Sequence, residues 1–492
     1  MMIPFGPWLP DQPAFRSGGS LEALNVIPTQ NGYRPFPGFS AVADAVTARA
    51  QGMFTCRGLT GTIHNFCGDA TKLYKMDSDG LGWTDASRLA GGAYTTAATG
   101  WWDFFQFGDT VIAINGADAA QSFTLSSSAN FAALGGSSPV ASFCGVVRGF
   151  GVMLRVSTAQ STVHWSGIED VTTWAASATT LSDTQILPDS GLIMGFVGGE
   201  FGLVFQERAI YRMAFEGPPT AFRFDRIANQ LGCRAERSIA GYEGLAFFLS
   251  DDGLQMVRGG VEIIPIGSEK FDRWLEDDID NENLDRISSA VDPINKLYLM
   301  GYPSTISSGG SPDTIFVYHW PTGKAARVRV NHEIIGTMAT QAGYTLDGLD
   351  SVSATLEALP HSLDSRIWTG SGRLVLGGFN TSHAFGYFDG TSLAATIDTF
   401  EDQLFKGRRA NVLAARPLIQ GSSVTPYITP IVRDLLHEPV SVGIAVAAND
   451  SGICPLRAHG RYFRGRVTTT AGDVWEHAIG IDDVFAVAGA PR

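Results

Sequence analysis

Cysteine is scarce in this sequence, and the arrangement of the few that occur excludes two common kinds of cross-link. Only five are present in 492 residues, without any C-x-x-C pair: Cys56, Cys67, Cys144, Cys233 and Cys454. An odd, scattered set is not a disulfide framework and lacks the spacing of a structural zinc site. We therefore expect each thiol to pack as a small apolar side chain in a reducing cytoplasm.

Targeting and membrane-spanning segments are also missing from the pattern. Residues Met1–Pro7 contain neither the basic start nor the apolar stretch of a secretory signal. No run of 18 or more apolar residues occurs, so we expect no membrane span. The sequence thus predicts a protein that is made and folded in a cytoplasm.

Charged residues are few and unevenly distributed. They make up 17% of the chain, and the formal net charge is −14. From Leu404 to Arg492, 10 Lys and Arg stand against 7 Asp and Glu, a net charge of +3, so the remaining 25 against 42 give −17. An acidic body argues against a broad electrostatic grip on nucleic acid, which usually needs a basic face.

Motifs for catalysis, nucleotide binding and metal binding are absent. The sequence has no G-x-S-x-G, Walker A, H-E-x-x-H or strand-linked G-x-G-x-x-G motif. Gly323-Lys324 lacks the flanking residues of a phosphate loop. The pairs His332-Glu333 and Glu476-His477 are expected in strands, where neighbours point to opposite faces and cannot share a metal. We therefore predict a non-enzymatic protein with no catalytic, cofactor-binding or metal-binding residues and no cofactor.

Acidic turns were the remaining candidates for a calcium or glycosidase site. Asp77–Gly80 and Asp278–Glu282 begin like an EF-hand loop, but both lack the acid at position twelve, and the second also lacks the sixth-position glycine. We interpret the first as a turn and the second as a solvated acidic run. Ser78–Trp83 and Ser250–Gly253 lack the spacing of a sialidase Asp-box, and turns of this composition fold hairpins.

Glycine and aromatic residues, in contrast, are abundant, with 57 glycines and 11% aromatics. From about residue 50 to 330, strands of four to seven residues alternate with glycine-rich turns, as in Thr110–Ile114 and Leu245–Leu249. This spacing indicates an all-β sandwich, barrel or propeller. A loose repeat of 40–50 residues, visible in "LIMGFVGGEFGLVFQERAIYRMAFEG" and "RSIAGYEGLAFFLSDDGLQMVRGGVEIIPIG", favours a β-propeller-like body of about six to seven blades.

The two ends of the chain differ from this body. Residues 1–45 contain seven prolines among the first forty positions together with aromatic anchors, which predicts an extended N-terminal arm or, alternatively, a ragged first strand. The body is expected over 46–405. A small C-terminal β-sandwich is predicted over 406–492 from these expected strands: Val412–Leu418, Thr425–Val432, Val440–Val446, Arg461–Thr468 and Val474–Ile479.

Two interruptions of the body are predicted. An acidic helical insertion is expected over 266–285, with Ser268 as N-cap and an apolar face of Phe271, Trp274 and Leu275. Its acidic side is interpreted as a solvated face, with a docking surface as the alternative. A loop excursion is expected over 337–360.

Three further stretches stand out: "PFGPWLPDQPAF…SLEALNVIPTQNGYRPFPGFSAV", "GGEFGLVFQERAIYRMAFEGPPTAFRFDRI" with the segment after it, and "RYFRGRVTTTAGDVWEHAIGIDDVFAVAGAPR". They resemble tail nozzle (packaged-DNA-stabilisation, head-to-tail) proteins of short-tailed bacteriophages. The resemblance implies a structural virion protein in the tail, a hexameric propeller ring that continues the DNA channel below the portal and adaptor. Adaptor, fibre, spike or needle proteins would be its partners, with transient passage of duplex DNA.

No functional residue carries over from this resemblance. We expect a neutral or acidic lining, along which DNA can slide without counterion release. Two alternatives stay open: a receptor-binding adhesin of a tail fibre, and a propeller glycosidase with a pair of catalytic carboxylates.

Overall fold

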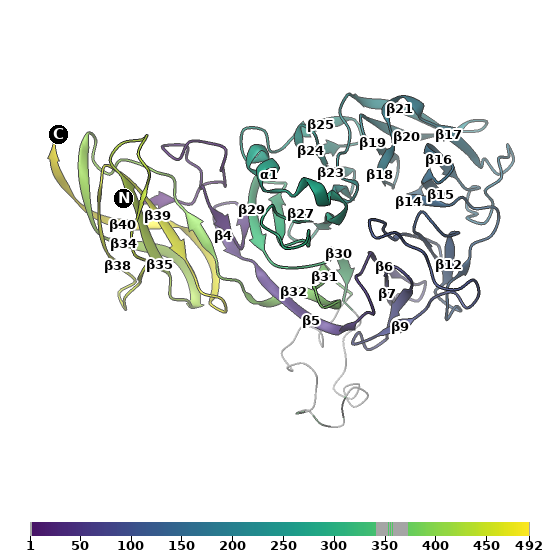
Figure 1. The fold of residues 1–492 in the computed structure, drawn as a ribbon, viewed down its shortest axis with the longest axis horizontal. Helices are drawn as coiled ribbons and strands as arrows, with labels where there is room; N and C mark the ends of the chain where they lie inside the picture. Colours follow the sequence, from purple (N-terminus) through teal and green to yellow (C-terminus); the bar gives the residue numbers. More distant parts are fainter. Residues whose placement is uncertain (1, 341–352, 354, 356, 358–371, 492) are drawn as a thin grey trace.

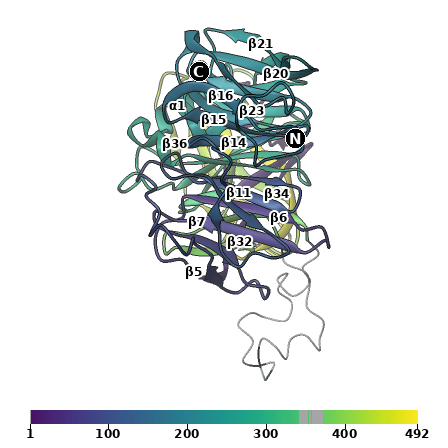
Figure 2. The same cartoon turned by 90° about the vertical axis from the view of Figure 1, so that its right-hand side faces the viewer.

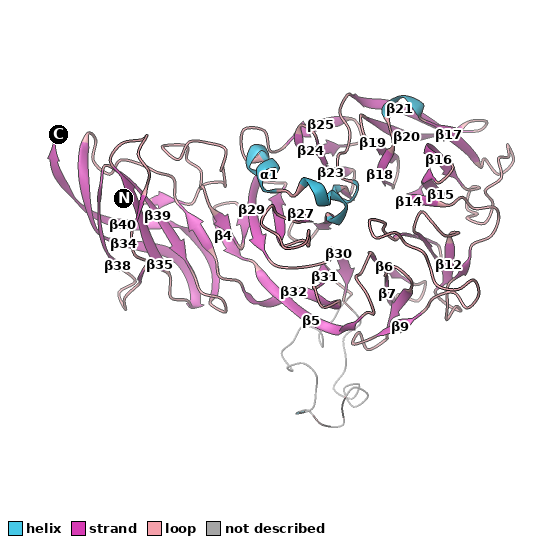
Figure 3. Ribbon diagram, in the orientation of Figure 1, coloured by secondary structure: helices cyan, strands magenta, loops and turns pink. Residues whose placement is uncertain are grey.

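The computed structural model describes residues 2–340, 353, 355, 357 and 372–491. Its strands form a seven-bladed β-propeller with a β-sandwich at its side (Figure 1). Helix is confined to a few short segments (Figure 3). The predicted all-β class with a propeller-like body is therefore confirmed. Figure 2 views the chain from the propeller end, with blades 2 to 4 in front.

Six blades each consist of four antiparallel strands that follow one another in the chain, and tight turns join many of the consecutive strands. Blade 1 contains β6 (Gly52–Arg57), β7 (Ile63–Gly68), β8 (Leu73–Met76) and β9 (Trp83–Asp85). Blade 2 contains β10 (Asp103–Phe107), β11 (Thr110–Ile114), β12 (Gln121–Thr124) and β13 (Ala132–Ala133). Blade 3 contains β14 (Ala141–Val147), β15 (Phe150–Val156), β16 (Ala159–Trp165) and β17 (Asp183–Ile186). Blade 4 contains β18 (Ile193–Val197), β19 (Gly202–Gln206), β20 (Ala209–Gly217) and β21 (Ala221–Asn229). Blade 5 contains β22 (Ala240–Tyr242), β23 (Leu245–Ser250), β24 (Gly253–Arg258) and β25 (Glu262–Pro265). Blade 6 contains β26 (Ser288–Asp292), β27 (Leu297–Tyr302), β28 (Thr314–His319) and β29 (Lys324–Arg329).

Blade 7 closes the ring with a strand from the other end of the body. It consists of β30 (Ile334–Ala339), β31 (Leu374–Phe379), β32 (Ala384–Ser392) and β5 (Pro37–Ala45). β5 pairs antiparallel with β32, so that Phe39 lies opposite Phe388. The first strand of each blade lies at the centre of the ring, where β26 contacts β30, β30 contacts β6, and β6 contacts β10.

The β-sandwich consists of two sheets, and strands from both ends of the chain build them. One sheet contains β1 (Ile3–Pro4), β3 (Val26–Thr29), β4 (Gly32–Pro35), β40 (Val474–Pro491), β34 (Arg408–Ser423) and β38 (Cys454–Gly460). The other contains β2 (Ala23–Leu24), β33 (Thr396–Asp398), β39 (Tyr462–Thr468), β35 (Tyr427–Arg433), β36 (Ser441–Val442) and β37 (Val446–Ala447).

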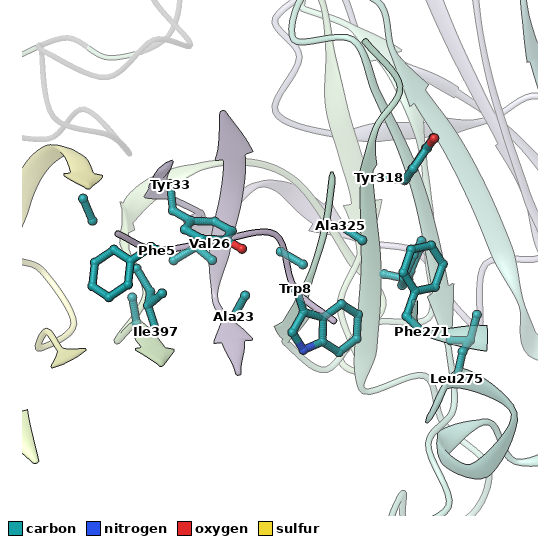
Figure 4. Packing of buried hydrophobic residues seen from close by; sticks show 14 of the residues in the cluster. Phe5, Trp8, Ala23, Val26, Tyr33, Phe271, Leu275, Tyr318, Ala325 and Ile397 are labelled. Atoms are coloured by element: carbon teal, nitrogen blue, oxygen red, sulfur yellow. The ribbon is translucent and has the colours of Figure 1, made fainter. Parts of the chain in front are cut away.

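Residues 1–45, for which the sequence predicts an extended arm, therefore contribute strands to both units. β2 is bonded to β29 of blade 6 on one side and to β33 on the other, which makes the second sandwich sheet continuous with that blade. One hydrophobic core also spans both units. Figure 4 shows Phe5, Val26 and Tyr33 on the sandwich side, and Trp8 beside Phe271 on the propeller side.

The acidic segment forms a shorter helix than predicted. α1 spans Asp272–Asp278, and a 3-10 helix, η3 (Asn281–Arg286), follows it; η1 (Pro188–Ser190) and η2 (Glu236–Ser238) lie elsewhere in the body. The predicted N-cap at Ser268 is wrong, because Phe271 precedes the helix. The apolar face is confirmed, since Phe271 and Leu275 are buried and Trp274 packs against the same core.

Other predicted features have mixed outcomes. Residues 337–339 of the predicted excursion belong to β30, and most of the remainder lies outside the described residues. The pair His332-Glu333 lies in the loop before β30 rather than in a strand, while Glu476-His477 lies in β40 as expected. All five cysteines are buried thiols, in agreement with the prediction.

Candidate functional site

Side chains from blades that are not neighbours meet at the propeller axis. Arg237 in η2, just before blade 5, donates to Asp103, the first residue of β10 in blade 2; Nη1 and Oδ1 are 3.1 Å apart. Trp101, just before β10, donates from Nε1 to the carbonyl oxygen of Asp285, just before blade 6, over 2.8 Å. Because blade 2 is adjacent to neither blade 5 nor blade 6, these two bonds cross the axis.

Cations stacked on aromatic rings complete this cluster. The Cζ atom of Arg237 lies 5.6 Å from the ring centroid of Trp101 and 5.3 Å from that of Phe143. Arg49 lies over Trp101 at 5.8 Å, and such stacking is attractive. We call the following residues the axial collar: Arg49, Trp101, Asp103, Phe143, Arg155, Glu236, Arg237 and Asp285.

The charges of the axial collar are matched within the cluster. Arg155 pairs with Glu236, and Asp103 also accepts the backbone N–H of Cys144 at 2.9 Å. Burial, with a further contribution from the nearby Arg286, lowers the pKa of Arg49 to about 10. Arg155 and Arg237 are thus held in ion pairs, while Arg49 donates to the carbonyl oxygen of Ala98, and buried N–H groups of Arg49 and Arg237 have no partner among the described residues.

The second candidate is an acidic hollow where the N-terminal segment meets α1. It measures about 430 Å³ and is lined by these residues: Asp11, Gln12, Pro13, Asp252, Ser268, Glu269, Asp272 and Arg273. The carboxylate of Asp11 accepts the backbone N–H groups of Arg273 and Trp274, both at 2.9 Å, and so satisfies two donors of the first helical turn. This contact performs the role that the sequence assigned to Ser268.

Asp272 lies at the wall of the acidic hollow in a tight setting. Its Oδ1 accepts the N–H of Leu254 at 3.2 Å, and its buried Oδ2 has no hydrogen-bond partner among the described residues. A Cβ atom at Gly253 would lie 2.4 Å from Asp272, and one at Gly267 only 1.8 Å, so both positions require glycine. Burial, followed by the nearby Asp11 carboxylate, raises the pKa of Asp272 to about 6.

The remaining sequence candidates are structural where the structure describes them. Asp77 and Gly80 close the β8–β9 turn, and Lys324 donates to the carbonyl oxygens of Thr29 and Gln30. Across the described part of the chain, no three His, Cys, Asp or Glu side chains gather in an arrangement that could hold a metal ion. Over the same residues, no helix is long and apolar enough to span a membrane.

Exposed apolar side chains are concentrated in the C-terminal part of the sandwich. Of nineteen large apolar residues that are exposed in the described chain, ten lie between positions 413 and 487: Leu413, Leu435, Leu436, Val440, Val442, Ile444, Val474, Ile479, Phe485 and Val487. Single exposed apolar residues are normal, whereas a high density of them is typical of interaction surfaces. The ten residues lie on strands and turns of both sandwich sheets. Composition did not reveal this concentration, because strand residues facing in and out look alike in the sequence.

Comparison with known proteins gives likeness of fold only. No family model matches the chain, and no curated protein matches it. Among solved structures, the extracellular domain of a one-component system from B. thetaiotaomicron is 10% identical, with a TM-score of 0.42; the alignment covers 80% of this chain and 46% of that one. The chain thus spans about half the length of that domain.

Two smaller proteins align over most of their own length. BamB from Moraxella catarrhalis is 10% identical with a TM-score of 0.37, and the alignment covers 74% of this chain and 92% of BamB. YCF48 bound to D1 peptide is 11% identical with a TM-score of 0.37, covering 61% and 92%. The propeller assignment stands on the strand topology described above.

Proposed function

We propose that this chain is a non-enzymatic structural protein of a bacteriophage tail, the subunit of a homohexameric nozzle that continues the DNA channel below the portal and adaptor. The observation that carries the proposal is the concentration of exposed apolar side chains on the sandwich. A subunit of a permanent ring needs such a surface beside a rigid body. The resemblance of the N-terminal, middle and C-terminal stretches to tail nozzle proteins supports the same role.

The axial collar determines where DNA would pass in such a ring. Hydrogen bonds across the axis, such as Arg237 to Asp103 at 3.1 Å, leave no room there for a duplex. The channel would therefore be the space enclosed by several copies. Residues 1–403, which include the whole propeller, carry 42 acids against 25 basic residues, which suits a lining that retains packaged DNA loosely and lets it slide on ejection.

Neighbours of the ring would be the adaptor on one side and fibre, spike or needle proteins on the other, in the virion tail assembled in a bacterial cytoplasm. Electron microscopy of the purified protein, alone and with the adaptor of the same virus, tests the proposal. We expect six-fold rings with a central hole. Monomers or trimeric stalks under all conditions would contradict the nozzle, and stalks that bind host glycans would favour the adhesin alternative.

A release assay on host polysaccharide separates the nozzle from the glycosidase alternative. Because no pair of carboxylates has been assigned a catalytic role, we expect no sugar release above the buffer blank. Release that survives repurification would overturn the non-enzymatic part of the proposal.

A further inference from the structure

Three arginines lie side by side on the outer face of the second sandwich sheet, and we call Arg433, Arg464 and Arg466 the arginine row. Arg464 and Arg466 are two positions apart in β39, and the pairing register of β35 places Arg433 on the same side. Gly465 faces the other sheet, where a Cβ atom would lie 2.3 Å from Cδ1 of Ile481. Because side chains alternate along a strand, the arginine row points away from the sandwich core.

The two outer members of the arginine row each hold a buried carboxylate. Arg466 donates to both oxygens of Asp398, over 2.7 and 3.0 Å. Arg433 donates in the same way to Glu401, with 2.8 Å between Nε and Oε1. Asp398 is 0% exposed and Glu401 is 1% exposed. Each of these carboxylates therefore already has an arginine as its bidentate partner.

Arg464 lies between these two pairs without a complete partner of its own. Its side chain is 11% exposed, and Oδ2 of Asp398 lies 3.8 Å from its Nε, beyond hydrogen-bond distance. This Nε is buried and has no hydrogen-bond partner among the described residues. Burial lowers the pKa of Arg464, with the Asp398 carboxylate opposing the shift. Because buried N–H groups are normally bonded, this guanidinium is short of an acceptor.

The local charges indicate which acceptor fits. Three guanidinium groups against two carboxylates, +3 against −2, leave a charge of +1 on this part of the sheet. Neighbouring charges are paired elsewhere, Arg16 with Asp402 and Glu22 with Arg327. A single negative charge carried by a planar pair of oxygens would balance the arginine row and match the guanidinium fork. A carboxylate has both properties, whereas a phosphate dianion would be repelled by the two buried carboxylates.

We propose that Arg464 binds a small carboxylate ligand between the two ion pairs of the arginine row. The ligand would accept two N–H groups of Arg464, as Asp398 accepts two from Arg466. The flanking guanidinium groups cannot turn away without leaving a buried carboxylate unpaired, so they hold the position of Arg464. The small exposed fraction of its side chain favours a small ion over the backbone of a duplex. The site does not depend on the nozzle role and adds a ligand to the sandwich.

Saturation-transfer difference NMR on the full chain tests the site, with sodium acetate as the probe and sodium chloride holding the ionic strength constant. Wild type is compared with R464K, R464Q and the matched control R457Q, which changes an exposed arginine of β38. We expect a saturable acetate signal in wild type and R457Q. The signal should fall about threefold or more in R464K, which keeps the charge but loses the fork, and should vanish in R464Q. Far-UV circular dichroism confirms that the variants are folded.

A second readout needs no substitution. Because a ligand of the folded chain stabilises it, we expect acetate to raise the unfolding midpoint of wild type by about 1 °C or more over chloride, in a saturable way. Equal acetate signals in wild type and R464Q, or a midpoint that rises without saturation, would overturn the site. Displacement of acetate by inorganic phosphate or a duplex oligonucleotide at lower concentration than by formate would overturn the carboxylate assignment.

Light scattering with and without acetate distinguishes the two sources of such a carboxylate. A molar mass that acetate lowers indicates a carboxyl side chain of a second copy, and an unchanged molar mass indicates a free organic acid. Protein that binds acetate at Arg464 but never forms rings would contradict the nozzle and leave the site intact. Six-fold rings without saturable acetate binding would do the reverse.

Discussion

Two buried titratable residues of the propeller, Asp272 beside the N-terminal segment and His332 in the loop before β30, give the molecule a defined response to pH. Asp272 and His332 are both shifted by burial, but in opposite senses for stability. The shift at Asp272 favours the protonated carboxyl in the folded state, whereas the shift at His332 favours the neutral imidazole. Each can be tested by a substitution that removes only the titration.

We expect D272N to stabilise the protein at pH 8. Folding raises the pKa of Asp272 to about 6. The stability that this carboxyl contributes is therefore fully present below its pKa in the unfolded chain and is lost as the pH rises through 6. After allowance for solvent screening, the free energy of unfolding of D272N at pH 8 exceeds that of the wild type by about 1 kcal/mol, and this difference decreases as the pH falls to 5. Urea unfolding at both pH values measures it. D252N, an exposed change at the same hollow, should have little effect at either pH.

His332 should make the fold sensitive to mild acid. Burial lowers its pKa to about 4, and Nδ1 lies 2.9 Å from the carbonyl oxygen of Val330. The unfolded chain binds the proton more readily, so stability is full above pH 6.5 and declines as the pH falls toward 4. Asparagine retains a donor in place of Nδ1.

In H332N we therefore expect a packing loss of about 1–2 kcal/mol at pH 7.5. At pH 5 the difference in free energy of unfolding between wild type and H332N should be smaller by about 2 kcal/mol. The wild type loses stability because His332 takes up a proton on unfolding, whereas asparagine does not titrate. Chemical unfolding over this pH range checks the result. A gap that stays constant with pH would contradict the assignment, and the exposed H477N provides the reference.

Among the elements, the closing strand β5 has the largest consequence for the propeller. Gly386 of β32 faces β5 so closely that a Cβ atom would lie 2.1 Å from the carbonyl oxygen of Ser40. We expect G386A to separate β32 from β5 and to cost about 2 kcal/mol or more. Tryptophan fluorescence during urea unfolding measures the loss. T391A, an exposed change in the same strand, should be nearly neutral.

The elements also show how far the sequence could predict the fold. The strand Thr110–Ile114 has the same bounds in the structure as in the prediction, because its short apolar run and the Gly108 turn before it are local signals. The pairing of β5 with β32 was missed, since its partners lie some 350 positions apart and no local pattern specifies them. The same reason explains Ser268: the donors of α1 are satisfied by Asp11, about 260 residues earlier.

The candidate sites were even less accessible from the sequence. Asp103 and Arg237 are ordinary residues in two separate blades, and only closure of the ring brings them within 3.1 Å. The acidic hollow combines residues from the N-terminal segment, the β23–β24 turn and α1. The absence of catalytic motifs, in contrast, could be stated from the sequence because such motifs are contiguous.

On the scale of the whole molecule, the N-terminal segment makes the propeller and the sandwich parts of one structure. Trp8 is only 1% exposed and packs on Phe271, Trp274 and Phe316 of the propeller side. Arg327 of blade 6 makes a bidentate ion pair with Glu22 of the same segment, at 2.7 and 3.0 Å. A continuous core and a shared sheet indicate that the two units unfold together.

We therefore expect a single calorimetric transition for the wild type, shifted to lower temperature in W8A. Truncation of a fully buried tryptophan lowers the free energy of unfolding by about 3–5 kcal/mol, and here both the propeller and the sandwich are destabilised. Differential scanning calorimetry checks both points. Two resolved transitions in the wild type, or a shift in W8A no larger than that of the exposed L59A, would contradict this expectation.

The position of β5 in the chain also has a consequence for synthesis. The strand that completes blade 7 leaves the ribosome first, and its partner β32 follows some 350 residues later. At usual elongation rates this delay is roughly 20 to 70 s, and during it the edge of β5 has no partner in its own sheet. Production of soluble protein should therefore depend on how long the cell can keep this early strand from pairing with a second nascent chain.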